Sequence, residues 1–225
     1  RKRIFIVGTK DKKIDLNGNQ PRFKSLESVL EKGLPTLKSY FIDKLLAHFP
    51  FEDLYGKSIK DKRGGDNNIH SWDIEIKGSV SKQQAEILNK LFKQRRKKQW
   101  AVEIGIDWMD GMALTLEQIN TFIDLPKTEL KTLLEDLTKK GYLKFEHPKK
   151  LVKLQTENGI STSRVYDETK PKGYNIVTGK LSFEINKVLD PKDIAPTLVA
   201  TDVSRLAVPD GNGLRRLTIR EGLRL

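Results

Sequence analysis

The fold of this chain is decided by residues 115–155, TLEQINTFIDLPKTELKTLLEDLTKKGYLKFEHPKKLVKLQ. Thr115 and Gln118 form the capping-box pattern that opens a helix, in which each side chain bonds to the other residue's backbone N–H. After the turn at 124–126, a further helix is indicated by four leucines spaced at i, i+3, i+4 and i+7: Leu130, Leu133, Leu134 and Leu137. Gly141 is placed to end that helix. The stretch therefore predicts two successive helices with apolar sides.

The segments on either side extend this pattern. Upstream, Ser81 and Gln84 form another capping box, which opens a helix. Its apolar side consists of Ala85, Leu88, Leu91 and Phe92. Downstream, the strand-like runs 142–146 and 151–155 flank the turn HPKK and predict a β-hairpin. Three helices followed by a hairpin is the order of a winged helix, whose third helix would enter a DNA groove. The alternative is a helical interaction or spacer module that only packs.

The remaining segments are shorter or more polar. Residues 56–71 hold turn formers and little apolar surface, which predicts a surface loop. Residues 156–174 predict a loop or a partly disordered segment, and 174–185 predict two short strands around the turn at 178–179. Core anchors are expected at three tryptophans, Trp72, Trp100 and Trp108. The expected fold class is α+β, with small strands and loops at both ends and a mainly helical, winged-helix-like middle.

Composition points to a nucleic-acid partner. The 225 residues include 42 Lys and Arg against 30 Asp and Glu, a net charge of +12. No apolar run approaches the ~18 residues of a membrane span, and the basic N-terminus lacks the apolar stretch of a signal peptide. Because cysteine is absent, the chain has no disulfide, thiolate metal site or cysteine nucleophile. Its three histidines are too dispersed to suggest a metal site. We therefore expect a soluble, cytoplasmic protein.

Both ends of the chain contain motifs that resemble those of one enzyme family. Near the C-terminus, the residues Arg216, Leu217, Thr218, Arg220, Glu221, Arg224 and Leu225 resemble a late pattern, R-x-L-T-x-R-E-x-x-R-L, of the cytosine-C5 DNA methyltransferases. Upstream, residues 196–199 (PTLV) are similar to the threonine-leucine pair near the end of the family's target recognition domain. Residues 1–8 (RKRIFIVG) are similar to the strand motif Q-x-R-x-R-I/V-x-x-V-G without its leading glutamine. The resemblance leaves residues 75–190 unmatched.

The resemblance implies roles for residues at both ends. C5 methylation within a duplex requires the base to leave the stack, a cysteine thiolate to add to its ring and arginine donors to stabilise the developing charge. By resemblance, Arg3 contacts the extruded cytosine and Arg1 supports the same site. Thr197 would bind the phosphate beside the flipped nucleotide, with Leu198 against the DNA. The plainer alternatives are a basic strand end and a strand start after Pro196. A structural role, anchoring the recognition domain to the catalytic one, is implied for Arg216, Arg220, Glu221 and Arg224.

Two further sets of residues are candidate DNA contacts. The loop at 62–71, KRGGDNNIHS, resembles a Gly-Gly recognition loop of smaller family members. Its candidates for reading base edges are Asp66, Asn67, Asn68 and His70. The alternative is a solvated loop. A basic run that could bind phosphates comprises Arg95, Arg96, Lys97 and Lys98. These residues could equally be solvated cations, which are favoured at a helix C-terminus.

The predicted organisation has four parts. Residues 1–74 hold the end of a catalytic-domain strand and the first part of the target recognition domain, and residues 75–155 a winged-helix-like insertion. Residues 156–214 form the second part of the recognition domain, and 215–225 begin a helix that returns to the catalytic domain. Because both ends cut across predicted elements, we expect a piece of a larger protein.

The expected function is that of a DNA-binding target recognition region in an S-adenosylmethionine-dependent DNA (cytosine-5-)-methyltransferase of a bacterial restriction–modification system. The family's glycine-rich cofactor loop and its Pro-Cys segment are absent from this sequence, so the region would bind no cofactor and be inactive alone. The expected partners are double-stranded DNA and the catalytic domain of the same parent chain. The alternatives are a winged-helix transcription regulator and a protein-interaction module.

Overall fold

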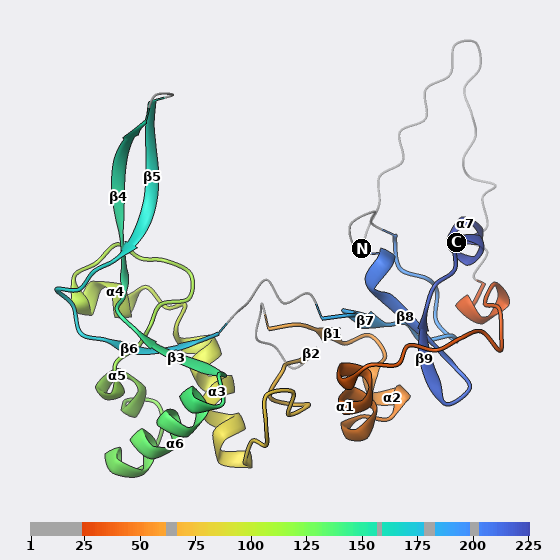
Figure 1. Cartoon of the computed structure of the whole chain (residues 1–225), viewed down its shortest axis with the longest axis horizontal. Helices are drawn as coiled ribbons and strands as arrows, with labels where there is room; N and C mark the ends of the chain where they lie inside the picture. Colours follow the sequence, from red (N-terminus) through yellow and green to blue (C-terminus); the bar gives the residue numbers. More distant parts are fainter. Residues whose placement is uncertain (1–23, 62–66, 157–158, 178–182, 199–202) are drawn as a thin grey trace, which may run out of the picture.

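The computed structural model describes residues 24–61, 67–156, 159–177, 183–198 and 203–225, which form a mixed α+β structure with two lobes (Figure 1). The terminal lobe contains η1 (Leu26–Ser28), α1 (Tyr40–His48), α2 (Phe51–Leu54), β1 (Ser58–Ile59), β2 (Asn68–Ile69), β7 (Lys187–Val188), η2 (Val203–Arg205), β8 (Leu206–Asp210), β9 (Gly213–Arg216) and α7 (Ile219–Arg224). The insert lobe contains α3 (Lys82–Gln94), α4 (Gln99–Ile104), α5 (Leu116–Asn120), α6 (Lys127–Lys139), β3 (Leu143–Glu146), β4 (Lys149–Thr156), β5 (Gly159–Tyr166) and β6 (Gly173–Ile176).

The helices of the insert lobe begin where the capping boxes predict. Ser81 Oγ accepts a hydrogen bond from the backbone N–H of Gln84 at the start of α3, and Thr115 Oγ1 does the same for Gln118 at the start of α5. In both cases the glutamine side chain returns the bond to the cap residue's N–H. α6 ends at the turn around Gly141, whose φ of +80° favours glycine. These three predicted helices are confirmed.

The insert lobe folds around a single apolar core. Buried side chains of α3, α5 and α6 meet in it, and Trp72 and Trp100 are buried there as predicted. The core residues of the helices are Ile87, Leu88, Leu91, Phe92, Ile119, Leu130, Leu134 and Leu137. Trp108 is 42% exposed, so its prediction as a core anchor is wrong. Its indole N–H bonds to the Arg96 carbonyl at the surface instead.

Strand pairing in the insert lobe differs from the prediction. β3 pairs antiparallel with β6, with Leu143 opposite Ile176, and β4 pairs with β5. The predicted hairpin between 142–146 and 151–155 is therefore wrong, and the predicted loop at 156–174 contains a strand. β5 has the sequence GISTSRVY, which lacks the alternation of apolar residues that marks a half-buried strand. β5 is formed by antiparallel pairing of eight residues with β4, and the sequence of β5 alone does not indicate this pairing.

In the sheet formed by β3 and β6, the backbone of β6 lies very close to the backbone of Leu114. Leu114 forms an isolated bridge with Tyr174 in β6, so β6 lies between Leu114 and β3. A Cβ at Gly173 would lie 2.4 Å from the Leu114 carbonyl oxygen. Only glycine fits there, because backbone atoms cannot give way as a flexible side chain can. β6 confirms the first of the two strands predicted at 174–185. The next described strand, β7, begins only at Lys187.

In the terminal lobe, short strands join segments that are far apart in the sequence. β8 lies between β7 and β9, parallel to the first and antiparallel to the second. β1 and β2 pair in parallel, and their register places Ile59 opposite Ile69, both buried in the lobe's core. The prediction of a surface loop over residues 56–71 is therefore wrong at these two strands. Its only two isoleucines anchor them in the interior.

A buried ion network closes the terminal lobe. Arg215 Nε lies 2.8 Å from Asp210 Oδ2, and Arg215 Nη2 lies 2.7 Å from Glu221 Oε1. Glu221 also caps α7 together with Thr218 and accepts from the backbone N–H of Glu31. The Arg215 hydrogen bond and the N–H groups of residues 33 and 34 lower the pKa of Asp210 to about 2. The network therefore ties the C-terminal motif to residues 31–34.

The described helices are all too short and too polar to pass through a lipid bilayer.

Candidate nucleic-acid interface

Two of the predicted recognition segments lie side by side in the terminal lobe. Thr197 lines a cavity of about 190 Å³ together with Ser58 and Lys60, and the cavity's other lining residues are Asn186, Lys187, Pro196 and Leu206. Ser58 is the register partner of Asn68, and its N–H donates to the Asn67 carbonyl at 2.8 Å. The structure therefore places Thr197 at the foot of the loop that leaves β1 and returns at β2.

The surroundings of Thr197 suit an anion. Thr197 and Asn67 are exposed, whereas Leu198 is half-buried and packs against the cluster around Leu189, Leu206 and Val208. The lining of the cavity includes two lysines and no carboxylate. Hydroxyl, ammonium and backbone N–H groups are the usual donors to phosphate oxygens. This part of the lobe can therefore hold a phosphate while leaving Asn67 and Asn68 close by.

Other predicted contacts are placed differently. His70 is 3% exposed and stacks on Trp72 with ring centroids 4.4 Å apart. Its Nδ1 lies 3.2 Å from Asp73 Oδ2. The prediction that His70 contacts DNA is at odds with this interior position, because the ring is enclosed by its aromatic neighbour. Asp66, Arg1 and Arg3 lie outside the described residues.

The residues of the C-terminal motif form ion pairs and hydrogen bonds within the terminal lobe. Glu221 is fully buried and bonded to Arg215, and Arg220 Nη1 lies 3.2 Å from Glu31 Oε1. Arg216 Nη2 lies 3.5 Å from the carbonyl of Glu184, and Arg224 is exposed. Arg215, which is not among the predicted motif residues, is the central cation of the network. It stands two residues before Leu217, which is the place of the first arginine in the pattern R-x-L-T-x-R-E, so the spacing of the motif selects Arg215 and not Arg216.

The basic run that follows α3, residues 95–98, has some side chains in the interior and others on the surface. Lys97 and Lys98 are exposed, and Lys98 Nζ lies 5.6 Å from the centre of the Trp108 ring. Arg96 is half-buried, with Nε 3.3 Å from Asp110 Oδ1. Arg95 is only 5% exposed. Two of the four predicted phosphate contacts are thus available on the surface, and Arg95 is directed inward.

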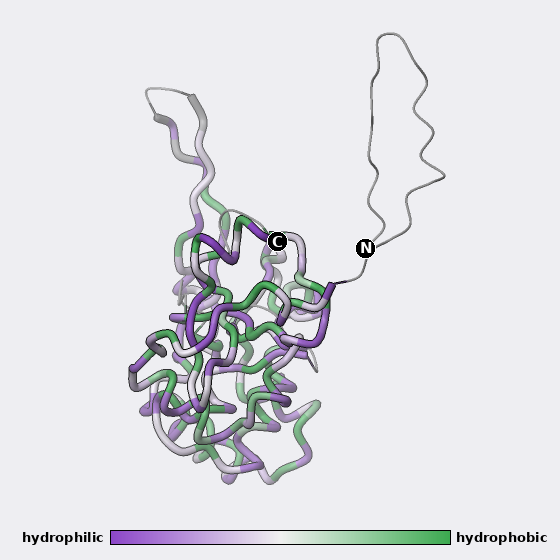
Figure 2. Tube along the Cα trace, turned by 90° about the vertical axis from the view of Figure 1, so that its right-hand side faces the viewer, coloured by the Kyte–Doolittle hydropathy of each residue, from purple (hydrophilic) through white to green (hydrophobic). Residues whose placement is uncertain are grey.

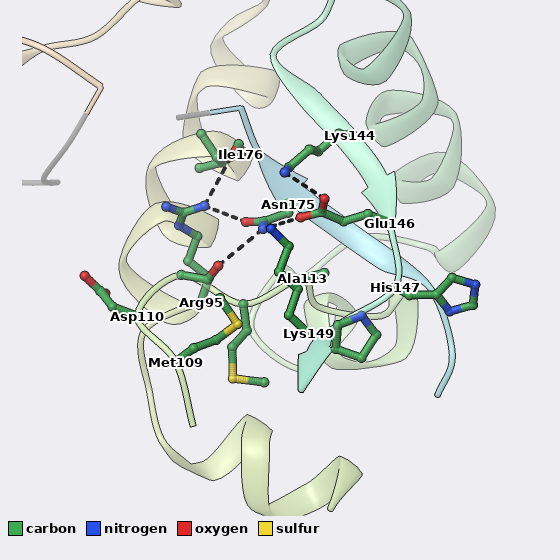
Figure 3. Close-up of a pocket in the computed structure, with 13 residues that line it drawn as sticks. Arg95, Met109, Asp110, Ala113, Lys144, Glu146, His147, Lys149, Asn175 and Ile176 are labelled. Carbon is green, nitrogen blue, oxygen red and sulfur yellow. Dashed lines mark hydrogen bonds and ion pairs between the residues drawn. The ribbon is translucent and has the colours of Figure 1, made fainter. Parts of the chain in front are cut away.

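Arg95 forms one wall of a polar cavity of about 250 Å³ at the foot of the β4–β5 hairpin (Figure 3). Its Nη1 donates to Asn175 Oδ1 and to the Ile176 carbonyl, and Asn175 Nδ2 donates to Glu146 Oε1 at 2.8 Å. Glu146 is paired with Lys144 at 2.7 Å. Burial, followed by the neighbouring charge of Arg96, lowers the pKa of Arg95 to about 10, so it remains cationic at neutral pH.

Gly111 allows the Arg95 guanidinium to take this position. Its φ is +85°, and a Cβ there would lie 2.8 Å from Arg95 Nη2. Within the described part of the chain, Arg95 has no carboxylate at ion-pair distance, and its Nε has no hydrogen-bond partner. Arg95 therefore acts chiefly as a buried brace between α3 and β6.

The predicted DNA-reading helix, α6, exposes paired charges. Lys127 Nζ lies 2.6 Å from Glu117, and Lys131 Nζ lies 3.8 Å from Glu135. Glu129 accepts a hydrogen bond from Gln83. Two outward lysines of this helix are thus offset by neighbouring carboxylates, although such exposed pairs contribute little to stability. A third, Lys139, is exposed near the end of the helix.

The described residues hold neither a metal-binding arrangement nor the usual cofactor turn. No group of three His, Asp or Glu side chains is gathered to hold a metal among them. Their parallel strand pairs, β1–β2 and β7–β8, are two residues long, and neither leads through a glycine-rich turn into a helix. The described residues therefore do not fit the glycine-rich binding turn expected for S-adenosylmethionine.

Comparison with known proteins finds sequence similarity to type II methyltransferases. It is 57% identical over all 225 residues to the type II methyltransferase M.NlaIV of Neisseria lactamica and 55% identical to M.NgoBV of Neisseria gonorrhoeae, covering 51% of each. It is 39% identical over 175 residues to the type II methyltransferase M.BanI of Aneurinibacillus aneurinilyticus, covering 33% of that protein. No family model matches, and no solved structure matches.

The chain spans about half the length of the first two of these relatives, and the similarity runs through the region between its end motifs. The homologues of this chain are type II methyltransferases, and it corresponds over its whole length to about half of such a protein.

Proposed function

We propose that this chain is the DNA target recognition region of an S-adenosylmethionine-dependent DNA (cytosine-5-)-methyltransferase. The observation that carries the proposal is the similarity over all 225 residues to half of two type II methyltransferases. The resemblance of residues 1–8 and 216–225 to the cytosine-C5 family supports the choice of C5. The net charge of +12 suits a region that binds DNA.

The region's task in this proposal is to bind and orient the duplex. Thr197 holds a backbone phosphate, with Leu198 packed behind it, and Asn67 and Asn68 stand beside the bases. This division of labour is supported by the shared cavity of Thr197 and Ser58 and by the register of Ser58 with Asn68. Arg3 and Arg1 are assigned to the extruded cytosine by resemblance alone. α7 and the Arg215 network return the chain to the catalytic domain.

Residues 75–155, extended by β5 and β6, form a winged-helix-like insertion in this proposal. Its support is the order of α3, α5, α6 and β3, together with a sheet in which β6 lies between β3 and Leu114. In such a unit α6 takes the place of the reading helix, and the β4–β5 hairpin takes the place of the wing. The insertion lengthens the surface that the protein presents to DNA.

The chemistry belongs to the rest of the parent enzyme. A cysteine nucleophile must come from elsewhere because this sequence contains none. S-adenosylmethionine supplies the methyl group when it is bound by the catalytic part. The parent enzyme would act in the cytoplasm, near the nucleoid, alongside a cognate restriction system. The alternative of a winged-helix transcription regulator has no support among the relatives, which are methyltransferases.

The proposal is tested with the whole parent enzyme on unmethylated plasmid DNA. After incubation with S-adenosylmethionine, the DNA is digested to nucleosides and separated by mass spectrometry. We expect 5-methylcytosine in amounts that rise with time. N4-methylcytosine or N6-methyladenine instead would refute the C5 assignment while leaving a DNA methyltransferase. Unchanged DNA would refute the function itself.

A second arm tests the recognition role. Thr197→Ala should raise the KM for DNA and leave the unfolding temperature of the enzyme unchanged, because the side chain is exposed. Leu198→Ala serves as the contrasting variant, since its half-buried side chain contributes to the lobe's packing.

A further inference from the structure

The β4–β5 hairpin extends away from the compact part of the insert lobe, as two perpendicular views show (Figures 1 and 2). Eight residues of each strand are paired, from Lys149 opposite Tyr166 to Thr156 opposite Gly159. Side chains on both faces are exposed or half-buried along the described positions. A bare two-stranded ribbon is marginally stable in water. A surface that contacts the ribbon in the working protein would therefore stabilise it.

The pleat of the hairpin separates its charges. Residues directly opposite each other share a face, and successive residues along a strand alternate between faces. One face, here called the basic face, carries Lys149, Leu151, Lys153, Thr162, Arg164 and Tyr166. The opposite face carries Lys150, Val152, Ser163 and Val165. Lys149 Nζ lies 5.0 Å from the centre of the Tyr166 ring, as expected for two residues on the same face.

The two faces differ in how their cations are compensated. Lys150, on the opposite face, lies 3.2 Å from Asp167 Oδ1. Within the described residues, Lys149, Lys153 and Arg164 have no carboxylate at ion-pair distance. Glu146, which accepts from the Tyr166 hydroxyl, is already paired with Lys144 at 2.7 Å. One face of a projecting ribbon therefore carries three cations that no described carboxylate compensates.

The dimensions of the basic face suit a nucleic-acid duplex. Lys149 and Lys153 are four residues apart on one strand, which is about 13 Å at the rise of a β-strand. Arg164 lies between them on the neighbouring strand, opposite Leu151. The major groove of B-DNA is about 12 Å wide and admits a two-stranded ribbon, with phosphates along both of its edges.

We propose that the basic face of the β4–β5 hairpin binds the phosphate backbone of duplex DNA, as a contact separate from that of Thr197. The inference rests on the proposed function, since it requires a protein that binds DNA. The ligand groups are phosphate oxygens, so the contact adds affinity without reading sequence. It would also stabilise a hairpin that has no further paired strand at either edge among the described residues.

The test compares variants of the whole parent enzyme by measuring DNA affinity at several salt concentrations. The double variant K153Q/R164Q removes two exposed cations of the basic face. Each phosphate contact contributes about 0.9 to the slope of log K against log salt. We therefore expect the double variant to bind more weakly and its slope to be smaller by about 1.8. The loss should be the same for DNA with and without the target sequence.

The control variant is K150Q, which removes a cation three residues away from Lys153 on the other face. Because Lys150 is already paired with Asp167, we expect its slope to match that of the wild type. Equal affinity and slope for K153Q/R164Q and the wild type would overturn the hairpin contact while leaving the proposed function intact. Failure of the wild-type enzyme to bind DNA would instead refute the proposed function.

A third outcome distinguishes a protein partner from DNA. If K153Q/R164Q lowers the unfolding temperature of the DNA-free parent enzyme and leaves the salt slope unchanged, the basic face is covered by another part of that enzyme. That result would also overturn the proposal. Both side chains are exposed in this structure, so we expect no change in unfolding temperature.

Discussion

Helix α6 and the β4–β5 hairpin lie in the same lobe, yet they use their lysines in opposite ways. α6 buries Leu130, Leu134 and Leu137 in the core, and its outward Lys127 and Lys131 face carboxylates. The hairpin contributes little to that core, and the cations Lys149, Lys153 and Arg164 on its basic face have no carboxylate at ion-pair distance among the described residues. A count of basic residues is therefore a poor guide to a binding surface. Compensation by neighbouring carboxylates matters more than the number of lysines.

The largest expected difference concerns stability. Leu134→Ala in α6 removes a fully buried side chain and should cost about 2–5 kcal/mol of unfolding free energy. Leu151→Ala in the hairpin removes a side chain that is 46% exposed and should cost less than about 0.5 kcal/mol. Urea unfolding followed by tryptophan fluorescence reports both values, since Trp72 and Trp100 lie in the same core. Similar costs would mean that the hairpin is part of the core.

A smaller effect is expected when Lys150 is released from its partner. Asp167→Asn removes the carboxylate that compensates this lysine and makes the hairpin more positive by one charge, which should tighten DNA binding by about twofold to threefold. The asparagine side chain in this variant keeps an oxygen that can accept the hydrogen bond from the Thr169 hydroxyl. Affinity measurements on the parent enzyme check this expectation. An unchanged affinity would mean that the charge of Asp167 does not influence the potential that the hairpin presents to DNA.

The ion pair between Lys150 and Asp167 also predicts how DNA affinity depends on pH. Hydrogen bonds from Thr169 and then Lys150 lower the pKa of Asp167, so the carboxylate stays ionised as pH falls from 8 to 5. Lys150 therefore remains compensated throughout this range and is released only in stronger acid. Wild-type enzyme should not acquire the tighter binding of D167N between pH 8 and pH 5. A gain in wild-type affinity that is absent from D167N would contradict this assignment.

The smallest expected effect belongs to α6. The double variant K127Q/K131Q removes two cations that are already paired, so DNA affinity should change by less than about twofold and the salt slope should stay the same. The measurement is the one used for the hairpin variants. A larger loss than that of K153Q/R164Q would reverse the comparison and make α6 the main DNA contact of the insert lobe.

Local pattern was sufficient for the helices of the insert lobe. The capping boxes at Ser81 and Thr115 and the leucine spacing from Leu130 to Leu137 depend on residues within one or two turns. Strand pairing was different. β3 is as compatible with β4 as with β6 by alternation alone, and β5 has no apolar pattern to mark it. The choice of partner depends on Leu114 and Gly173, which lie far along the chain from β3.

The candidate sites show the same division. Residue types suggested that Thr197 and the Asn67–Asn68 pair bind DNA, but only the pairing of β1 with β2 beside the Thr197 cavity brings them together. Polar character suggested that Arg95 and His70 lie on the surface. Asn175 and Trp72, which come from other segments, instead hold them in the interior.

The order of amino acids by itself determined the positions of α3, α5 and α6, the basic character of the chain and the two end motifs. These features depend on neighbours in sequence, through backbone hydrogen bonds, helical periodicity and total charge. Only the tertiary structure decided which cations are compensated, which strands pair and which polar side chains are buried. These outcomes depend on contacts between residues tens of positions apart, and the free energy of such contacts is fixed only when the whole chain has packed.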